Sequence, residues 1–231
     1  GDAFTLVGTT LRGLESPDRA AFYTSGRLGN EASFLYQWFV REFGTNNFPD
    51  CSNMCHEASG VALQAALGTA KGTVDLEDWE KADAIFVLGV NAASNGPRML
   101  TYLAEAIRRG ARVVHINPLI EAGGTRTIVP HELVDMALFR ATSTSTLDIQ
   151  PRIGGDAALI RGMSKALLEM TSTDQDAIDH LFIERYTSGF AAYRTICETA
   201  SWDELERQSG VPQGQIREIA GIYRNARASI I

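Results

Sequence analysis

The residues best suited to chemistry in this chain are Cys55 and His56, which follow a turn-rich stretch and precede a run of small residues. Asparagine, proline and serine before Cys55 favour turns. Residues 56–67 predict a helix of small side chains, which another backbone or a ligand could approach closely. A thiol just before a helix lies near the positive end of the helix dipole, which favours the thiolate. Cys55 is therefore a candidate nucleophile or metal ligand.

Other interpretations of Cys55 stay open at this level. Free cysteines are often buried packing residues without a chemical role. Residues 51–56 are close to a haem attachment motif, but three residues separate the cysteines where that motif has two. A thiol enzyme that pairs Cys55 with His56 is disfavoured, because adjacent residues at a helix start point about 100° apart and make a poor nucleophile–base pair.

Two strands and the helix between them predict a parallel sheet. Residues 84–88 and 112–116 are apolar strand patterns, and Pro97 begins a helix that runs to about residue 109. Such a unit has parallel strands and a right-handed crossover, and ligands bind beyond the carboxyl ends of its strands. The loops at 89–96 and 117–121 are therefore candidate binding segments. No Gly-x-Gly-x-x-Gly follows the first strand, which disfavours NAD.

The N-terminal part predicts a second strand–turn–helix pattern. Residues 20–25 predict a short buried strand, and Gly26-Arg27-Leu28-Gly29 predicts a tight turn. A helix over residues 30–43 follows, with Asn30 as its N-cap and Gly44 after its end. This geometry can present backbone N–H groups to an anion.

The remaining sequence predicts one long loop and a helical tail. Residues 122–148 read as an irregular, insertion-like loop. Gly154-Gly155-Asp156 then introduces a helix that runs to about residue 170, and residues 174–227 predict successive amphipathic helices. Outside the Cys55 region, the histidines at 115, 131 and 180 have no pattern of chemical partners, so we interpret them as structural.

Composition bounds the class of protein. The chain has 231 residues, 45% of them hydrophobic, and a formal net charge of −7, which favours neither nucleic acid nor an anionic membrane as partner. It contains no transmembrane run and no apolar leader. Its three cysteines, an odd number, argue against a secreted disulfide framework, so we expect a cytoplasmic location. A start without methionine and a strand-like end lead us to expect a piece of a longer protein.

Six short motifs follow one another along nearly the whole chain. In order they are Thr24-Ser25-Gly26-Arg27 with Asn30-Glu31; Gly44-Thr45-Asn46-Asn47; Cys51-Ser52-Asn53-Met54-Cys55-His56; Leu88-Gly89-Val90-Asn91 with Pro97; Asn117-Pro118; and Gly154-Gly155-Asp156. Each motif is loose, but their order is specific. Together they resemble the molybdopterin oxidoreductase family of the dimethyl sulfoxide reductase type, in its formate-dehydrogenase-like alpha subunit branch.

The resemblance implies an α/β fold in which a Rossmann-like parallel sheet, layered with helices, is inserted into a second, truncated α/β domain. Residues 1–48 would begin that second domain. Residues 49–227 would form the inserted domain that binds molybdopterin guanine dinucleotide. Residues 228–231 would be the strand that returns to the first domain. The chain would then be a central fragment of the subunit, inactive by itself because half of the cofactor site is missing.

The resemblance also implies roles for individual residues. Cys55 matches the cysteine or selenocysteine that ligates molybdenum, and a soft thiolate is a sensible ligand for such a metal. His56 matches a histidine that handles a proton beside the metal. The positions that match contacts to the pterin cofactor are Arg27, Cys51, Leu88, Gly89, Val90, Asn91, Ala92, Ala93, Ser94, Asn95, Asn117, Pro118, Leu119, Ile120, Glu121, Gly154, Gly155 and Asp156.

The implied cofactor is bis(molybdopterin guanine dinucleotide) with molybdenum, or with tungsten. A [4Fe-4S] cluster would lie in a preceding segment, because this chain has no N-terminal cysteine cluster. The implied partners are a small-molecule substrate and an electron-transfer protein, without nucleic acid or membrane. Two departures weaken formate as the substrate: Asn117 stands where formate dehydrogenases commonly have aspartate, and residues 122–148 look like an insertion.

An alternative function stays open beside this one. A redox-inactive member of the family could bind a nucleotide or a partner protein without redox chemistry. The absence of cluster cysteines from this chain motivates that alternative. The residues that flank the sequence in the whole protein would separate the two hypotheses, because a cysteine-rich segment supports electron transfer.

Overall fold

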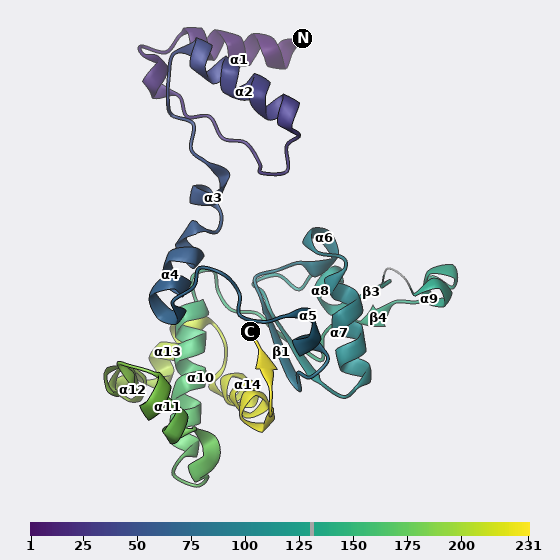
Figure 1. Cartoon of the computed structure of the whole chain (residues 1–231), viewed down its shortest axis with the longest axis vertical. Coiled ribbons are helices and arrows are strands. Elements are labelled where there is room, and N and C mark those ends of the chain that lie inside the picture. Colours follow the sequence, from purple (N-terminus) through teal and green to yellow (C-terminus); the bar gives the residue numbers. More distant parts are fainter. Residues whose placement is uncertain (130–131) are drawn as a thin grey trace. The chain divides into compact units, whose positions relative to one another are not determined.

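The computed structural model describes residues 1–129 and 132–231, and the side chains of Cys51 and Ser52 lie outside the described part. The chain folds into two compact units, Gly1–Thr73 and Val74–Ile231 (Figure 1), and each is described by itself.

A parallel sheet of four strands lies at the centre of the second unit. Its strands are β1 (Ala84–Leu88), β2 (Arg112–Ile116), β5 (Leu147–Ile149) and β6 (Ser229–Ile230), in the order β5-β2-β1-β6. All three pairings are parallel. The two strands predicted from apolar runs are confirmed at the predicted residues. Strands covered on both faces carry apolar side chains on both, which explains why the run at 84–88 is continuous.

Helices cover both faces of this sheet. On one face, α7 (Met99–Arg108) packs against Ile85, Val87 and Val113 in a buried cluster. On the other face lie α10 (Asp156–Met170) and α14 (Gln213–Asn225) (Figure 1). These helices pack against the alternate side chains of the strands: Ala84, Phe86, Val114 and Ile116. The predicted α/β class, a parallel sheet layered with helices, is confirmed.

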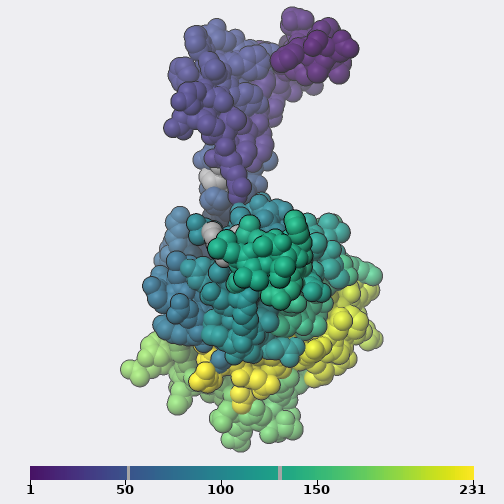
Figure 2. Space-filling view, turned by 90° about the vertical axis from the view of Figure 1, so that its right-hand side faces the viewer, coloured from purple at the N-terminus to yellow at the C-terminus, as the bar shows by residue number. Residues whose placement is uncertain are grey.

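The predicted amphipathic tail is also confirmed as helices. Between α10 and α14 the chain forms η2 (Gln175–Ala177), α11 (His180–Tyr186), α12 (Phe190–Thr199) and α13 (Trp202–Ser209). Pro212 immediately precedes α14, because a residue without a backbone N–H is tolerated at a helix start. Figure 2 shows the C-terminal residues, in yellow, against the green residues of the preceding helices.

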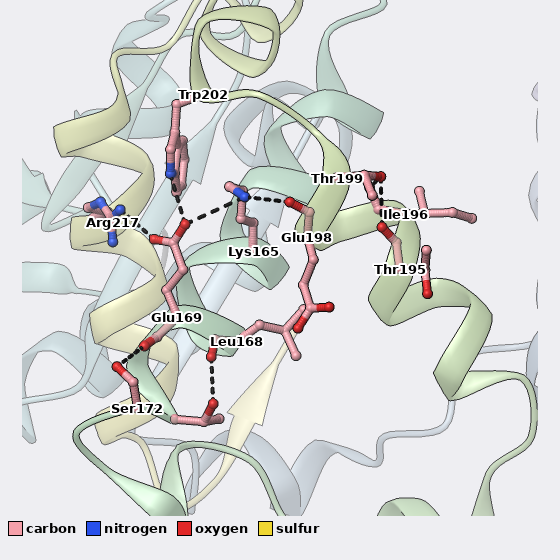
Figure 3. Close-up of polar contacts among 11 residues, drawn as sticks. Lys165, Leu168, Glu169, Ser172, Thr195, Ile196, Glu198, Thr199, Trp202 and Arg217 are labelled. Atoms are coloured by element: carbon pink, nitrogen blue, oxygen red, sulfur yellow. Dashed lines mark hydrogen bonds and ion pairs between the residues drawn. The ribbon is translucent and has the colours of Figure 1, made fainter.

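A polar cluster joins α10 to α13 and α14 (Figure 3). Glu169 on α10 accepts hydrogen bonds from Trp202 Nε1, at 3.0 Å, and from Arg217. The Arg217 guanidinium also lies 4.6 Å from the centre of the Trp202 ring. Lys165 Nζ lies 3.5 Å from Glu169 and donates to the backbone oxygen of Glu198 at 2.9 Å. One carboxylate therefore connects three helices through charged and aromatic groups.

The first unit is helical. It contains α1 (Asp2–Arg12), η1 (Pro17–Arg19), α2 (Asn30–Phe43), α3 (Cys51–Met54) and α4 (Glu57–Leu67). The helices predicted over 30–43 and from residue 56 are confirmed, with Gly29 and His56 as their N-caps. The expected N-cap at Asn30 is wrong by one residue, because Asn30 is already the first residue of α2.

The predicted strand at residues 20–25 is wrong. The segment forms no strand in the described structure. Phe22 N donates to Asn47 O at 2.8 Å. Further hydrogen bonds with neighbouring segments come from side chains, Asn47 Nδ2 to Ala20 O and Tyr36 Oη to Tyr23 O. The Phe22 ring instead packs edge-on against Tyr36, Phe39 and Phe43. Of the run predicted to be buried, Phe22 is buried at 7% exposed, whereas the neighbouring Tyr23 is 50% exposed.

The predicted long loop at 122–148 is also wrong. It contains α8 (Ala122–Thr125), the antiparallel pair β3 (Arg126–Thr127) and β4 (Thr142–Ser143), α9 (Leu133–Ala137), and the start of β5. Two further short helices, α5 (Leu76–Trp79) and α6 (Ala92–Asn95), flank β1. His131, interpreted as structural, lies outside the described residues.

The predicted domain boundaries at residues 49 and 228 stay a prediction. Within the second unit, Ser229 and Ile230 pair with Ala84 and Ile85, so these residues extend the central sheet. Among the described residues, no helix combines the length and apolar composition needed to cross a membrane.

Candidate functional site

The carboxyl edge of the sheet brings together three of the predicted binding segments. Because β1, β2 and β5 are parallel neighbours, the segments that follow them leave the sheet at the same edge. Gly89 N donates to Ile116 O at 2.9 Å, and Asn117 N donates to Ile149 O at 3.0 Å. These bonds extend the ladder one residue beyond each strand. Segments 89–95, 117–121 and 150–156 are thus adjacent.

The segment after β1 is a capped helical turn. Asn91 is the N-cap of α6, and its side-chain oxygen accepts from Ser94 N at 3.2 Å. Ala92 is buried in the core beneath this turn, while Ser94 and Asn95 are exposed. The side of the turn away from the core is therefore polar and accessible.

The segment after β2 is held from two directions. Asn117 Nδ2 donates to Glu121 Oε2 at 3.3 Å, and Gln150 Nε2 donates to Pro118 O at 3.2 Å. Between these contacts, the side chains of Leu119 and Ile120 are 67% and 55% exposed. This edge of the sheet consequently offers apolar surface beside its polar groups.

The segment after β5 contains a glycine that no larger residue could replace without movement. An ideal Cβ at Gly155 would lie 2.9 Å from the backbone oxygens of Arg152 and Gln208 and from Ser209 Cα. Arg152 N donates to Ser209 O at 2.7 Å in the same contact. Asp156 follows as the first residue of α10, and it is exposed. Its carboxylate lies at the positive end of a 15-residue helix.

Cys55 and His56 lie in the first unit, between α3 and α4. Both residues are exposed. His56 is the N-cap of α4 and lines a hollow of about 520 Å³. The other residues that line it come from α4 and the segment after it: Glu57, Gly60, Val61, Gln64, Ala65, Ala70 and Lys71. Of the small residues predicted to allow close approach, Gly60 and Ala65 line this hollow.

Two further predicted contacts belong to the first unit. Arg27 is exposed in a turn, where its backbone N donates to Ser25 Oγ at 3.1 Å. Cys51 is the first residue of α3, and its side chain lies outside the described part of the structure. The predicted site residues therefore divide between the two units: Arg27, Cys51, Cys55 and His56 in one, and all others in the other.

No three His, Cys, Asp or Glu side chains converge on a possible metal site within the described part of the chain. The free thiols described there are Cys55, exposed, and Cys197, buried in α12. Cys55 is therefore the described thiol that an exogenous metal could reach.

The structure adds residues to the sheet edge that the sequence did not indicate. Gln150 supports the segment after β2, and Arg152 contacts the segment before Gly210 through Ser209 O and Arg207 O. Both follow β5, which has three residues and is too short for an alternating pattern. A signal was present only in the turn residues 154–156, which were predicted to bind.

Comparison with known proteins provides independent evidence. A model of the family described as molybdopterin oxidoreductase matches residues 1–210. Protein YdeP of Escherichia coli K12 is 44% identical over 99% of this chain and 31% of its own length. F420-dependent formate dehydrogenase 1 subunit alpha of Methanococcus maripaludis is 27% identical, over all of this chain and 31% of that protein.

Among solved structures, acetylene hydratase from Pelobacter acetylenicus matches 99% of this chain and 28% of its own, with a TM-score of 0.58. At 16% identity, this likeness concerns the fold. The chain spans about a third of the length of the curated relatives it matches.

Proposed function

The chain belongs to the molybdopterin oxidoreductase family, and on that premise we propose that it is part of a molybdenum enzyme that binds molybdopterin guanine dinucleotide and performs two-electron redox chemistry. The main support is the convergence of segments 89–95, 117–121 and 150–156 at one edge of a parallel sheet. In parallel sheets, this is the edge where nucleotide-containing ligands bind.

The chemistry of the edge suits such a ligand. We assign the turn at 89–95 to the pyrophosphate, and Asn117 and Asp156 to the guanosine. The exposed carboxylate of Asp156 can accept hydrogen bonds from the N–H groups of a heterocycle. The exposed Leu119 and Ile120 offer apolar surface to a flat ring.

The second part of the proposal assigns Cys55 as the protein ligand to molybdenum and His56 as a proton carrier. The exposed thiol of Cys55 is accessible, and a thiolate is a soft ligand. The described residues provide no larger metal cluster, and a metal bound mainly by the sulfur atoms of its own cofactor requires none. When bound, the cofactor supplies the two-electron chemistry at the metal. The imidazole of His56 would then hold or release a proton during the reaction.

The finer proposals concern the whole protein. The relationship to a formate dehydrogenase alpha subunit supports formate-dehydrogenase-like chemistry on a small-molecule substrate. Electrons would pass to a separate partner, through a [4Fe-4S] cluster in another segment of the protein. Tungsten could replace molybdenum, and bis(molybdopterin guanine dinucleotide) is the proposed cofactor form.

Cofactor analysis of the full-length protein tests the function. We expect the purified protein to contain molybdenum or tungsten and to release guanosine monophosphate on acid hydrolysis. Asp156→Ala should lower the amount of guanine nucleotide retained. Asp203→Ala is the matched control, because Asp203 is an exposed aspartate in the first turn of α13. Protein that contains neither metal nor guanine nucleotide would favour the redox-inactive alternative.

A further inference from the structure

His115 is a polar residue in the core, beneath the proposed pyrophosphate segment. It is 3% exposed and lies near the end of β2. In the register of the sheet it stands between Val87 of β1 and Asp148 of β5. Burying an imidazole costs free energy unless its nitrogen atoms find partners. The partners of His115 therefore indicate what the ring does.

Both ring nitrogens of His115 face groups on other segments. Nε2 lies 3.3 Å from the backbone oxygen of Val90, in the turn that follows β1. A carbonyl oxygen can only accept a hydrogen bond, so a hydrogen bond between these two atoms requires a hydrogen on Nε2. Nδ1 lies 3.5 Å from Asp148 Oδ1, and that carboxylate accepts from Ser145 Oγ at 2.8 Å. The ring thus lies between the turn after β1 and the carboxylate of Asp148 on β5.

The segment above the ring is shaped to admit it. An ideal Cβ at Gly124 would lie 2.4 Å from His115 Cε1 and 2.5 Å from Nε2, so α8 can cross the ring only with glycine at this position. The neighbouring Gly123 lies equally close to α6, because a Cβ there would be 2.3 Å from the Cβ of Ala93. His115, α8 and the turn at 89–95 consequently form one packed unit.

We propose that His115 is a positioning residue, which fixes the turn at 89–95 in the conformation that meets the cofactor phosphates by holding the carbonyl of Val90. The purpose of this turn rests on the proposed function, whereas the clamp itself is a property of the fold. An apolar residue could fill the same space, but it would leave the Val90 oxygen without its donor. The turn would then be held by Gly89, Asn91 and packing alone.

Hydrogen exchange of the present chain tests the clamp without any cofactor. In His115→Leu, backbone amides of residues 89–96 should exchange about tenfold faster, the size expected for the loss of one hydrogen bond to a buried group. His115→Gln should restore slow exchange, because its terminal amide can donate to the same carbonyl. Val114→Ala is the matched control: Val114 is buried on the opposite face of the sheet. It should lower the stability without a selective effect on residues 89–96.

The two variants are compared after correction for any difference in their free energies of unfolding. The proposal is overturned if the amides of residues 89–96 exchange no faster in His115→Leu than in Val114→Ala. Should His115→Leu fail to fold, long-range ¹H–¹⁵N spectra of the wild-type chain decide instead. We expect a hydrogen on Nε2 of His115. A bare Nε2 would exclude donation to Val90 and would refute the clamp.

Cofactor retention in the full-length protein separates this inference from the proposed function. We expect His115→Leu to retain less pterin than wild type after gel filtration, and His115→Gln to retain an amount near that of wild type. Equal retention by wild type and His115→Leu would contradict the inference and leave the proposed function standing. Wild-type protein without any pterin would contradict the proposed function, and the exchange experiment would still decide on the clamp.

Discussion

Cys55 and His56 are adjacent in sequence, but they have different surroundings and different proposed tasks. His56 is the N-cap of α4 and faces the hollow lined by that helix, whereas Cys55 precedes the cap and does not line it. A metal ligand and a proton carrier need to be near each other without bonding to each other. Cys55 lies before the N-cap and His56 is the N-cap itself, so the two residues are neighbours in the chain with separate roles.

At the level of single residues, we predict that His56→Ala slows turnover of the full-length enzyme by about 10²–10⁴-fold, the usual contribution of a positioned proton carrier. Its molybdenum content should match that of wild type, because the thiolate remains. His180→Ala, at an exposed position that begins α11, is the control and should change neither quantity. Full turnover by His56→Ala would remove His56 from the mechanism.

Gly155 provides a second test at the level of single residues. Gly155→Ala should destabilise the chain by about 1–3 kcal/mol, the cost of forcing a Cβ against fixed backbone atoms. It should also weaken retention of guanine nucleotide, since Asp156 is the next residue. Gly214→Ala in α14 is the control, because a Cβ there meets nothing within 4 Å. In urea unfolding, Gly214→Ala should raise the free energy of unfolding by about 0.5–1 kcal/mol. Equal changes in the free energy of unfolding for the two substitutions would be inconsistent with close packing at Gly155.

Among the secondary-structure elements, the Glu169 cluster determines how α10, α13 and α14 pack. Partial burial raises the pKa of Glu169, but hydrogen bonds from Arg217 and Trp202 and the charges of Arg217 and Lys165 outweigh it. The net pKa is therefore below that of an ordinary glutamate. Such a group stabilises the fold above its unfolded pKa, and the stabilisation is lost as the pH falls through the folded pKa.

Glu169→Gln should accordingly lower the free energy of unfolding by about 1 kcal/mol at neutral pH. This predicted change in the free energy of unfolding is modest because 36% of the Glu169 side chain is exposed. The difference from wild type should persist down to about pH 4.5, near the pKa of an unfolded glutamate, and shrink below it. Urea unfolding at several pH values measures this, with Glu184→Gln at an exposed site on α11 as control. A difference independent of pH would refute the role of the Glu169 charge.

The elements that could be predicted from sequence are those with a strong local signal. Residues 84–88 are an uninterrupted apolar run, and residues 112–116 contain three β-branched apolar residues. Gly154-Gly155-Asp156 marks the start of α10 at the residue where it begins. The strand β5 has three residues, and its place in the sheet depends on pairing with Val114, His115 and Ile116. Pairing between distant segments leaves no periodic pattern in the sequence, so β5 was missed and residues 20–25 were given a strand.

The candidate site shows the same limit. Turn residues at the strand ends indicated segments 89–95, 117–121 and 154–156, because glycine and asparagine signal turns locally. The contacts of His115 with Val90 and Asp148 join three segments, and sequence alone indicated only a structural histidine. Gln150 was missed for the same reason, since its contact with Pro118 depends on the pairing of β5 with β2.

At the scale of the whole molecule, the two units differ in how much they bury. In the described part of the first unit, Phe22, Val40 and Thr45 are the buried residues, whereas the second unit has two extensive apolar clusters. Large apolar side chains on α1 and α2, such as Phe4 and Phe34, are 87% and 62% exposed. Stability should therefore be concentrated in residues 74–231.

Hydrogen exchange of the present chain tests this difference. We predict the strongest protection in β1, β2, α10 and α14, and weak protection throughout residues 1–73, because local opening there exposes little apolar surface. Binding of other parts of the full-length protein to the exposed side chains should raise protection in residues 1–73. Equal protection of both units in the present chain would contradict this account.

The central claim is that Cys55 ligates molybdenum, and X-ray absorption at the molybdenum edge of full-length Cys55→Ser tests it most directly. We predict at least about tenfold less bound molybdenum than in wild type. Any molybdenum that remains bound should be coordinated by an oxygen atom in place of one sulfur atom. Cys197→Ala, which removes the buried thiol of α12, should leave both unchanged. Wild-type molybdenum content and unchanged sulfur coordination in Cys55→Ser would contradict the claim.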